Sequence, residues 1–448
     1  MNARKPVSLN LNVRGMGQSA TLAVNEKCRA LRAAGRPVFN MGLGQSPFPV
    51  PVIVVEALRN AACEKDYLPA KGLPALRDAV AEFHRKHEGV DVHPDGVIVG
   101  PGSKELMFLV QLVFYGEILV SAPCWVSYLP QARIIGRTVN VLSTSHESGW
   151  RITAAQLRRS LEMVQDDYRP RLLVLNYPSN PTGLTYSTVE LREIAEVARA
   201  FGLIVLSDEI YGQLHHLGKH ESIAKYYPEG TIISSGLSKW CGAGGWRLGT
   251  FAFPPDLDWL LDAVAVVASE TYTSVSAPIQ HAAVRAFRGG VAIERYLWHA
   301  RRILSGLGSH CAAVLERAGA RVHQPEGAFY LFVDFSPLSE QLAARGITDG
   351  ATLVERLLAE AGVACLPGVS FVQPRSELTA RLAYIDFDGA AALAASENIP
   401  LHEPLPAEFT RERCPQVHAG VERISAWLAG ETPAGSDWNT PAAAVHGR

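Results

Sequence analysis

The sequence lacks the features that define several common classes of protein. Its seven cysteines are odd in number and include no CxxC pair, so neither a zinc-ribbon site nor a disulfide framework is indicated. The fourteen histidines contain no HExxH motif. Lysine plus arginine (42) nearly balances aspartate plus glutamate (44), and the net charge of −2 offers no basic surface for nucleic acid or an anionic membrane.

Long apolar runs are also missing. Stretches such as LIVL at 203–206 are far shorter than a membrane span, and the opening MNARKPVSLNLNVRG has no apolar core of a signal peptide. Together with scattered cysteines, these absences favour a cytoplasmic protein without a membrane partner. His215 and His216 are adjacent and therefore point different ways, so we expect no metal site.

The composition that remains is that of a globular protein in two or three domains, with 448 residues, 48% of them hydrophobic and 19% charged. Residues 1–49 are expected to form an N-terminal arm and part of a smaller domain. Residues 50–290 alternate helical patterns with apolar runs and are expected to form a large cofactor-binding domain. Residues 291–430 begin with a long helix and continue as a small α+β domain. Residues 431–448 are rich in Pro, Gly, Ala and Ser and are predicted to be disordered.

Seven short apolar runs in the second part are predicted strands. Continuous apolar runs of this length are typical of strands that are buried on both faces of a parallel sheet. Amphipathic stretches between them, such as 188–202, complete a βαβ pattern. We therefore predict the α/β class, with a large domain built on a mostly parallel sheet flanked by helices, plus the smaller α+β domain. The predicted strands are 97–100, 117–122, 137–142, 171–177, 203–209, 231–236 and 249–253.

Polar residues follow several of these strands. LIVLSDEIY places Asp208 at a strand's carboxyl end, where open α/β sheets bind ligands, although a helix cap is an equal alternative. Asn180 projects from the loop NYPSNPTG, which by itself is also typical of a plain turn. GPGSKELMFL, which contains Ser103 and Lys104, is a glycine-rich strand-to-helix junction suited to phosphate or to an ordinary βα turn. Trp125 in APCWVSY is placed to stack on a flat ring or to pack in a core.

Lys239 and Arg247, in GLSKWCGAGGWRLG at 236–249, give these weak signals a common meaning. A lysine amine is the group that forms a Schiff base with a carbonyl cofactor. Pyridoxal phosphate requires such a lysine, an acidic partner for its ring nitrogen and ligands for its phosphate. An arginine guanidinium binds a phosphate with two parallel hydrogen bonds. The combination indicates a pyridoxal-phosphate site.

Over about residues 15–430 the chain resembles the pyridoxal-phosphate-dependent aminotransferases of fold type I, class I/II. The most specific parts of the likeness are NPTG, SDEIY and SKxxxxGGWRLG. The resemblance implies that Lys239 binds the cofactor and later shuttles a proton, and that Asp208 pairs with the pyridine nitrogen. It further implies that Tyr211 and Asn180 bond the phenolic oxygen, that Trp125 stacks on the ring, and that Ser103, the Lys104 backbone, Ser238 and Arg247 hold the phosphate.

Further segments carry implications for partners and substrates. YLPAKGLPALRDAV resembles the family's tyrosine segment, in which Tyr67 would reach the phosphate of another subunit, so a homodimer with shared sites is implied. RLAYIDF matches the segment whose arginine, here Arg381, holds the substrate's α-carboxylate. Gly44 in GLGQSPF matches a glycine whose backbone closes over the substrate. The implied reaction moves an amino group between an L-amino acid and a 2-oxo acid.

Within the family, QSATLAVNEK and PCWVSY look most like the bacterial aspartate aminotransferases, a subgroup that includes aspartate/prephenate enzymes. Lys104 matches a lysine that assists the distal carboxylate there, so aspartate-like or glutamate-like substrates are expected. Four features depart from the subgroup. Gly17–Gln18 replaces a lysine-proline used for prephenate, QSPF replaces EPDF, 110–119 is short, and 397–416 is an extra segment. The first argues against prephenate, and the others leave aromatic or aliphatic amino acids open as substrates.

Two other classes share this scaffold. A pyridoxal-phosphate lyase or synthase uses the same cofactor contacts, because a fold does not fix its chemistry. A cofactor-binding regulator would ordinarily carry a fused DNA-binding domain, and this N-terminus is short and not basic. An assay with aspartate and 2-oxoglutarate separates these classes.

Overall fold

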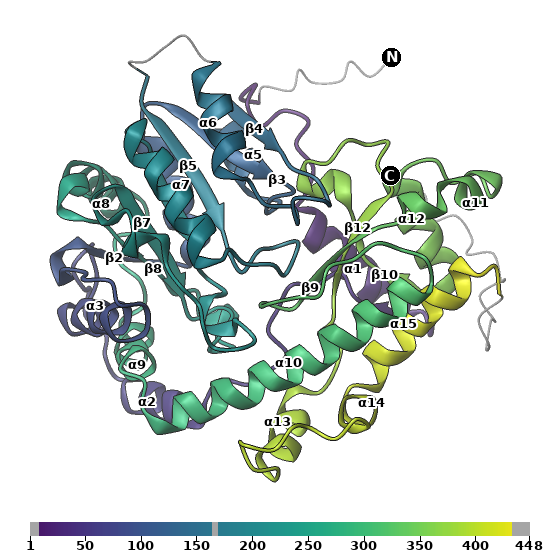
Figure 1. Cartoon of the computed structure of the whole chain (residues 1–448). Helices are drawn as coiled ribbons and strands as arrows, with labels where there is room; N and C mark the ends of the chain where they lie inside the picture. Colours follow the sequence, from purple (N-terminus) through teal and green to yellow (C-terminus); the bar gives the residue numbers. More distant parts are fainter. Residues whose placement is uncertain (1–8, 164–168, 432–448) are drawn as a thin grey trace, which may run out of the picture.

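The computed structural model describes residues 9–163 and 169–431 and contains a central seven-stranded sheet (Figure 1). The tail predicted to be disordered lies, from residue 432 on, outside the described residues. Each predicted strand is present, with ends that differ by no more than two residues. In spatial order the strands are β2 (Val97–Gly100), β8 (Gly249–Ala252), β7 (Thr231–Gly236), β6 (Ile204–Asp208), β5 (Arg171–Asn176), β3 (Glu117–Ala122) and β4 (Val139–Ser143).

All pairings among β3 to β7 are parallel, whereas β8 runs antiparallel to both of its neighbours, β2 and β7. The connection from β7 to β8 contains only one short 3-10 turn, Gly244–Trp246, and no α-helix. Parallel neighbours need a longer crossover, so the chain returns antiparallel here. The mostly parallel sheet predicted from the sequence is confirmed, with β8 as the exception.

The central strands are covered on both faces, as their continuous apolar runs require. Along β5, Leu172 and Val174 join one hydrophobic cluster, and the alternating Leu173 and Leu175 join another. The first cluster is formed with α4 (Ser103–Val113), α5 (Tyr128–Ile134) and α8 (Asp258–Thr271), and the second with α6 (Ala154–Glu162) and α7 (Thr188–Ala200).

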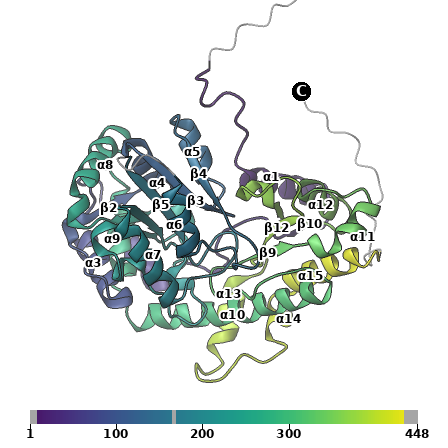
Figure 2. The ribbon, with the colours of Figure 1, turned by 45° about the horizontal axis from the view of Figure 1, so that its top comes forward.

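A second group of elements surrounds a three-stranded antiparallel sheet of β11 (Leu366–Pro367), β12 (Thr379–Ala383) and β9 (Tyr330–Asp334). The α+β character expected of the C-terminal part is confirmed, while the boundaries at 49, 290 and 430 stay predictions. Helix α10 (Val291–Arg317) runs from the large sheet's side to α15 (Pro415–Leu428) in both views (Figures 1 and 2). The remaining helices are α1 (Ala20–Ala33), α2 (Val52–Asn60), α3 (Pro74–Glu88), α9 (Ala277–Phe287), α11 (Ser339–Ala344), α12 (Gly350–Arg356), α13 (Gly389–Glu397) and α14 (Phe409–Arg413).

The N-terminal arm joins this second group. Its two-residue strand β1 (Phe39–Asn40) pairs in parallel with β10 (Val363–Ala364). The extra segment 397–416 is anchored to α10, because the Arg302 guanidinium donates hydrogen bonds to the carbonyls of Ile399 (2.9 Å) and Pro400 (3.2 Å). No helix within the described ranges is long and apolar enough to span a membrane.

Candidate active site

A cavity of about 320 Å³ lies where strands of the large sheet end at their carboxyl sides. It brings together all the predicted site residues except Tyr67, whose side chain lies elsewhere on the surface and is 90% exposed. The predicted residues that line it are Gly44, Ser103, Lys104, Trp125, Asn180, Asp208, Tyr211, Ser238, Lys239, Arg247 and Arg381.

Asp208 occupies the last position of β6, and its carboxylate is held from two sides. The Tyr128 hydroxyl donates to Oδ2 at 2.7 Å, and the Ser234 hydroxyl donates to Oδ1 at 3.1 Å. Burial raises the pKa of Asp208, and the hydrogen bonds from Tyr128 and Ser234 act in the opposite direction. The carboxylate is therefore fixed in orientation at the cavity wall.

Sequence reasoning missed Tyr128 and Ser234. Ser234 sits on β7 directly opposite Asp208 in the strand register, so correct pairing of the two predicted strands would have found it. Tyr128 begins α5, and its reach to Asp208 depends on how that helix packs under the sheet. No local sequence signal marks that contact.

Lys239 lies just beyond β7, and its amine points into the cavity. Its Nζ donates to the Gly44 carbonyl at 2.6 Å and lies 5.4 Å from the centroid of the Tyr211 ring. Burial, with the positive charges of Arg381 and Arg247, lowers the pKa of Lys239 to about 8, although Asp208 opposes this shift. About a tenth of the amine is therefore uncharged at pH 7, far more than for a lysine in water, and the uncharged form is the one that attacks a carbonyl.

Arg381 is a buried cation on β12, with 1% of its surface exposed. Its Nη1 donates to the Asn180 side-chain oxygen at 3.1 Å, its Nη2 donates to the Gly42 carbonyl, and the guanidinium lies over the Tyr330 ring. Its Nε has no hydrogen-bond partner within the described ranges, where no carboxylate forms an ion pair with Arg381 either. A buried, unneutralised guanidinium at a cavity is typical of a carboxylate-binding site.

The N-terminus of α4 also lines the cavity. Its N-cap, Gly102, has φ of +91° and provides no side-chain cap, so no cap occupies the N–H groups of Ser103 and Lys104. The Glu105 N–H donates to the Gly102 carbonyl at 3.1 Å. The Arg247 guanidinium lies against this turn, and a Cβ built on Gly102 would be 2.2 Å from Arg247 Nη2. Ser103 and Ser238 add two hydroxyls to the same cavity. The arrangement is suited to an anion.

Hydrogen bonds between neighbouring strands and loops keep the remaining groups in place. Asn176 accepts from the Asn180 backbone N–H at 2.7 Å and donates to the Asp208 carbonyl at 2.8 Å. The Tyr211 hydroxyl is bonded to the Tyr330 hydroxyl at 2.7 Å. Asn176 and Tyr330 line the cavity and were not predicted.

Trp125 and Lys104 lie together in the cavity lining. The Trp125 ring meets Tyr128 edge-on, with centroids 5.3 Å apart, and the Lys104 Nζ lies 5.5 Å from the Trp125 ring centroid. Burial, and then the charge of Arg247, lowers the pKa of Lys104. Within the described residues, no carboxylate forms an ion pair with Lys104.

Comparison with known proteins agrees with this geometry. The profile of the family "Aminotransferase class I and II" matches residues 36–383. The aspartate aminotransferase of Geobacillus stearothermophilus is 32% identical over 380 residues, which cover 82% of this chain and 93% of that protein. The aspartate/prephenate aminotransferase of Thermus thermophilus is 33% identical over 368 residues, covering 81% and 91%.

Among solved structures, the aspartate aminotransferase from Thermus thermophilus with maleate superposes with a TM-score of 0.79 at 30% identity, covering 94% of this chain and 99% of that one. Sequence and structure thus agree over nearly the whole length. The chain belongs to the class I and II aminotransferase family and is an aminotransferase.

Proposed function

We propose that this aminotransferase uses pyridoxal phosphate and prefers amino acids that resemble aspartate or glutamate. One observation carries the proposal: a single cavity holds a lysine amine with a pKa of about 8, a carboxylate fixed by two hydroxyls and a buried guanidinium without an anionic partner. Each of these groups is costly to bury alone, and together they complement a charged cofactor and a charged substrate.

The residues present fit the cofactor. The open N-terminus of α4 beside a guanidinium suits a phosphate, and the held carboxylate suits a protonated ring nitrogen. When bound, pyridoxal phosphate supplies an electron sink that makes the α-proton of an amino acid acidic. The residues proposed to hold it are Lys239 at the carbonyl, Asp208 at the ring nitrogen, Tyr211 and Asn180 at the phenolic oxygen, Trp125 at the ring face, and Ser103, the Lys104 backbone, Ser238 and Arg247 at the phosphate.

Side chains of the cavity would bind the substrate and transfer its proton. Arg381 binds the α-carboxylate through its planar fork, and Asn180, bonded to that guanidinium, fixes its orientation. The Lys239 amine is the base that takes the α-proton of the substrate and delivers it to the carbonyl carbon of the cofactor. Among the described residues, the only other amine that lines the cavity is that of Lys104. The Gly44 carbonyl, which accepts from Nζ, holds the amine within the cavity.

The dicarboxylate preference is supported by Lys104. Arg381 recognises the carboxylate that every amino acid carries, so selection needs a second cation. Lys104 is a cation of the same cavity and has no ion pair among the described residues. Maleate, present in the Thermus thermophilus structure, is itself a dicarboxylate.

The test is Lys104→Ala, with kcat/KM measured for aspartate and for phenylalanine. Loss of a charge-assisted hydrogen bond should cost about 1–3 kcal/mol for aspartate, that is roughly 5- to 150-fold. Phenylalanine leaves no carboxylate unpaired and should lose much less. Arg137→Ala, which removes an arginine stacked on the Tyr115 ring, is the control for loss of a surface cation. An equal loss for both substrates would refute the role of Lys104.

Two coarser proposals accompany this one. Tyr67 is a large aromatic left 90% exposed, which supports its burial against a second copy of the chain in a homodimer. The seven unpaired cysteines, six of them buried, support residence in the reducing cytoplasm.

A further inference from the structure

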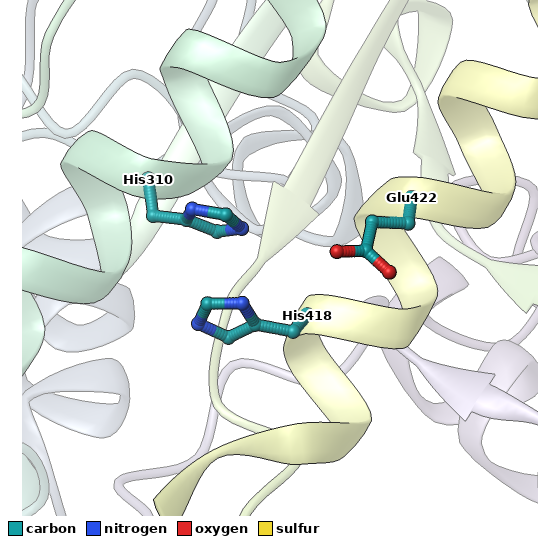
Figure 3. Close-up of side chains that lie close together, drawn as sticks. All are labelled: His310, His418 and Glu422. Atoms are coloured by element: carbon teal, nitrogen blue, oxygen red, sulfur yellow. The ribbon is translucent and has the colours of Figure 1, made fainter. Parts of the chain in front are cut away.

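Two helices of the second group of elements bring three metal-binding side chains together. His310 comes from α10, and His418 and Glu422 lie one turn apart on α15, so both face the same neighbour. One ligand atom from each residue lies within 4.8 Å of the others. Figure 3 shows the two imidazoles and the carboxylate turned toward one another. The imidazole rings stack, with centroids 3.8 Å apart and 21° between their planes.

One nitrogen on each ring is buried without a partner. His310 Nε2 and His418 Nδ1 have no hydrogen-bond partner among the described residues, and His418 as a whole is only 5% exposed. Buried polar atoms are nearly always satisfied, so two neighbouring orphans require an explanation. The nitrogen lone pairs lie in the ring planes, so an ion that satisfies both nitrogens must lie at the edges of the two rings, on the side of Glu422 (Figure 3). Neither ring contributes to the aminotransferase cavity.

Thr410 favours the tautomer of His418 in which Nε2 carries the proton. The His418 Nε2 lies 3.1 Å from the Thr410 hydroxyl oxygen, and donation of that N–H leaves Nδ1 with a free lone pair. Metal-ligating histidines characteristically donate their second nitrogen to an oxygen in this way. Thr410 lies in the extra segment 397–416.

We propose that His310, His418 and Glu422 form a binding site for a divalent transition metal, with Zn²⁺ as the preferred ion. Two imidazoles and one carboxylate are a ligand set that zinc favours, and water would complete a tetrahedral shell. The ligand atoms must close to about 2.0–2.2 Å from the ion, so the two stacked rings must separate until their lone pairs converge. The exposed Glu422 is free to move by rotation about its side-chain bonds. Such an ion would link α15 to α10, and the hydrogen bond between Thr410 and His418 would connect the extra segment to the same site.

No metal site was expected from the sequence, because these three residues form no short motif of metal ligands. His310 and His418 are 108 positions apart (418 − 310), and only the packing of α10 on α15 joins them. The site is also separate from the proposed cofactor chemistry, so either proposal can fail alone.

The test is zinc binding to the full-length chain after treatment with a chelator. A Cys63→Ser background removes the exposed thiol, which is the competing soft ligand on the described surface. Equilibrium dialysis with ZnCl₂ should give one ion per chain. His310→Ala should abolish this stoichiometric binding, Glu422→Gln should weaken it at least about tenfold, and Thr410→Val should weaken it about 10- to 100-fold. His402→Ala, which removes an exposed histidine from the same extra segment, is the matched control and should change nothing.

Two further measurements distinguish loss of metal ligands from misfolding of the variants. Glu422 is exposed, so Glu422→Gln should keep the melting temperature of the metal-free chain. Co²⁺ bound in place of Zn²⁺ should show visible bands of nitrogen and oxygen ligation without sulfur charge transfer, and these bands should vanish in His310→Ala. Absence of stoichiometric zinc, binding unchanged by both His310→Ala and Glu422→Gln, or a sulfur-type cobalt spectrum would overturn the proposal.

Discussion

At Lys239, three effects on one amine combine to favour its reactive form. Removal from water disfavours the ammonium, and the guanidinium groups of Arg381 and Arg247 disfavour it further, while Asp208 recovers only part of the loss. The net pKa of about 8 is well below that of a lysine in water. The same arginines that suit a carboxylate and a phosphate therefore also prepare the amine.

This shift predicts a pH profile for the cofactor-free protein. A group whose pKa falls to about 8 is protonated below that pH and uncharged above it, so trapping of pyridoxal on Lys239 by borohydride should rise with pH and reach half its maximum near pH 8. Peptide mass spectrometry follows the site, and a short lysine peptide in the same buffer is the reference, because a lysine in water titrates near 10.4. A Lys239 midpoint near that of the reference peptide would contradict the account.

The hydroxyl of Tyr128 gives a second prediction at this scale. Tyr128→Phe keeps the ring but removes the 2.7 Å hydrogen bond to Asp208. A hydrogen bond to a charged group contributes about 1.5–3 kcal/mol, so cofactor affinity should fall by roughly 10- to 150-fold in equilibrium dialysis. Tyr227→Phe removes a buried hydroxyl that donates to the Leu203 carbonyl instead, and should leave affinity unchanged. Equal affinities in both variants would show that Tyr128 does not position Asp208.

At the scale of elements, the start of α4 depends on one glycine. Gly102 has φ of +91°, and any Cβ there would meet the Arg247 guanidinium at 2.2 Å. Arg247 itself has φ of +56°, so the backbone brings helix and guanidinium together from both sides. The open helix terminus and the cation are thus one unit.

Gly102→Ala should damage the anion site as well as the fold. The strained backbone should cost about 1–3 kcal/mol of unfolding free energy, and the displaced guanidinium should weaken inorganic phosphate and cofactor binding. Gly89→Ala is the matched control: Gly89 also has positive φ (+65°), but a Cβ there meets nothing within 4 Å. That variant should lose about 1–2 kcal/mol of stability with phosphate binding intact. Unchanged phosphate affinity in Gly102→Ala would contradict this view of α4.

Strand positions were predictable because burial on both faces imposes continuous apolar runs such as RLLVLN in β5. The direction of β8 was harder to predict, because it depends on the glycine-rich connection from β7 rather than on any pattern within the strand. The position of Asp208 near the site was predictable because it follows an apolar run, and ligands of parallel sheets bind at the carboxyl ends of strands. Tyr128 and the His310–His418 pair were not, since helix packing alone creates their contacts.

At the scale of the whole molecule, Tyr67 lies apart from the cavity of its own chain. Its side chain is 90% exposed and does not line the cavity, although the resemblance gives it a role at the cofactor phosphate. A residue from a second chain would meet that role, and a surface aromatic is the kind of group that interfaces enrich.

Mixed dimers test this arrangement. Tyr67→Phe and Lys239→Ala chains, each weakly active or inactive alone, should regain activity when refolded together, because one site of the hybrid carries both native residues. Sedimentation should show a dimer throughout, and refolding each variant with itself is the control. A fully active monomer, or no recovery in the hybrid, would rule out sharing of the site.

The most direct measurement for the account as a whole is amino transfer from aspartate to 2-oxoglutarate by the purified protein supplied with pyridoxal phosphate. The account predicts steady formation of oxaloacetate and glutamate in equal amounts, lost in Lys239→Ala, the variant of the amine that donates to Gly44. Undiminished turnover in Lys239→Ala, or a wild-type protein that consumes aspartate without forming glutamate, would contradict it.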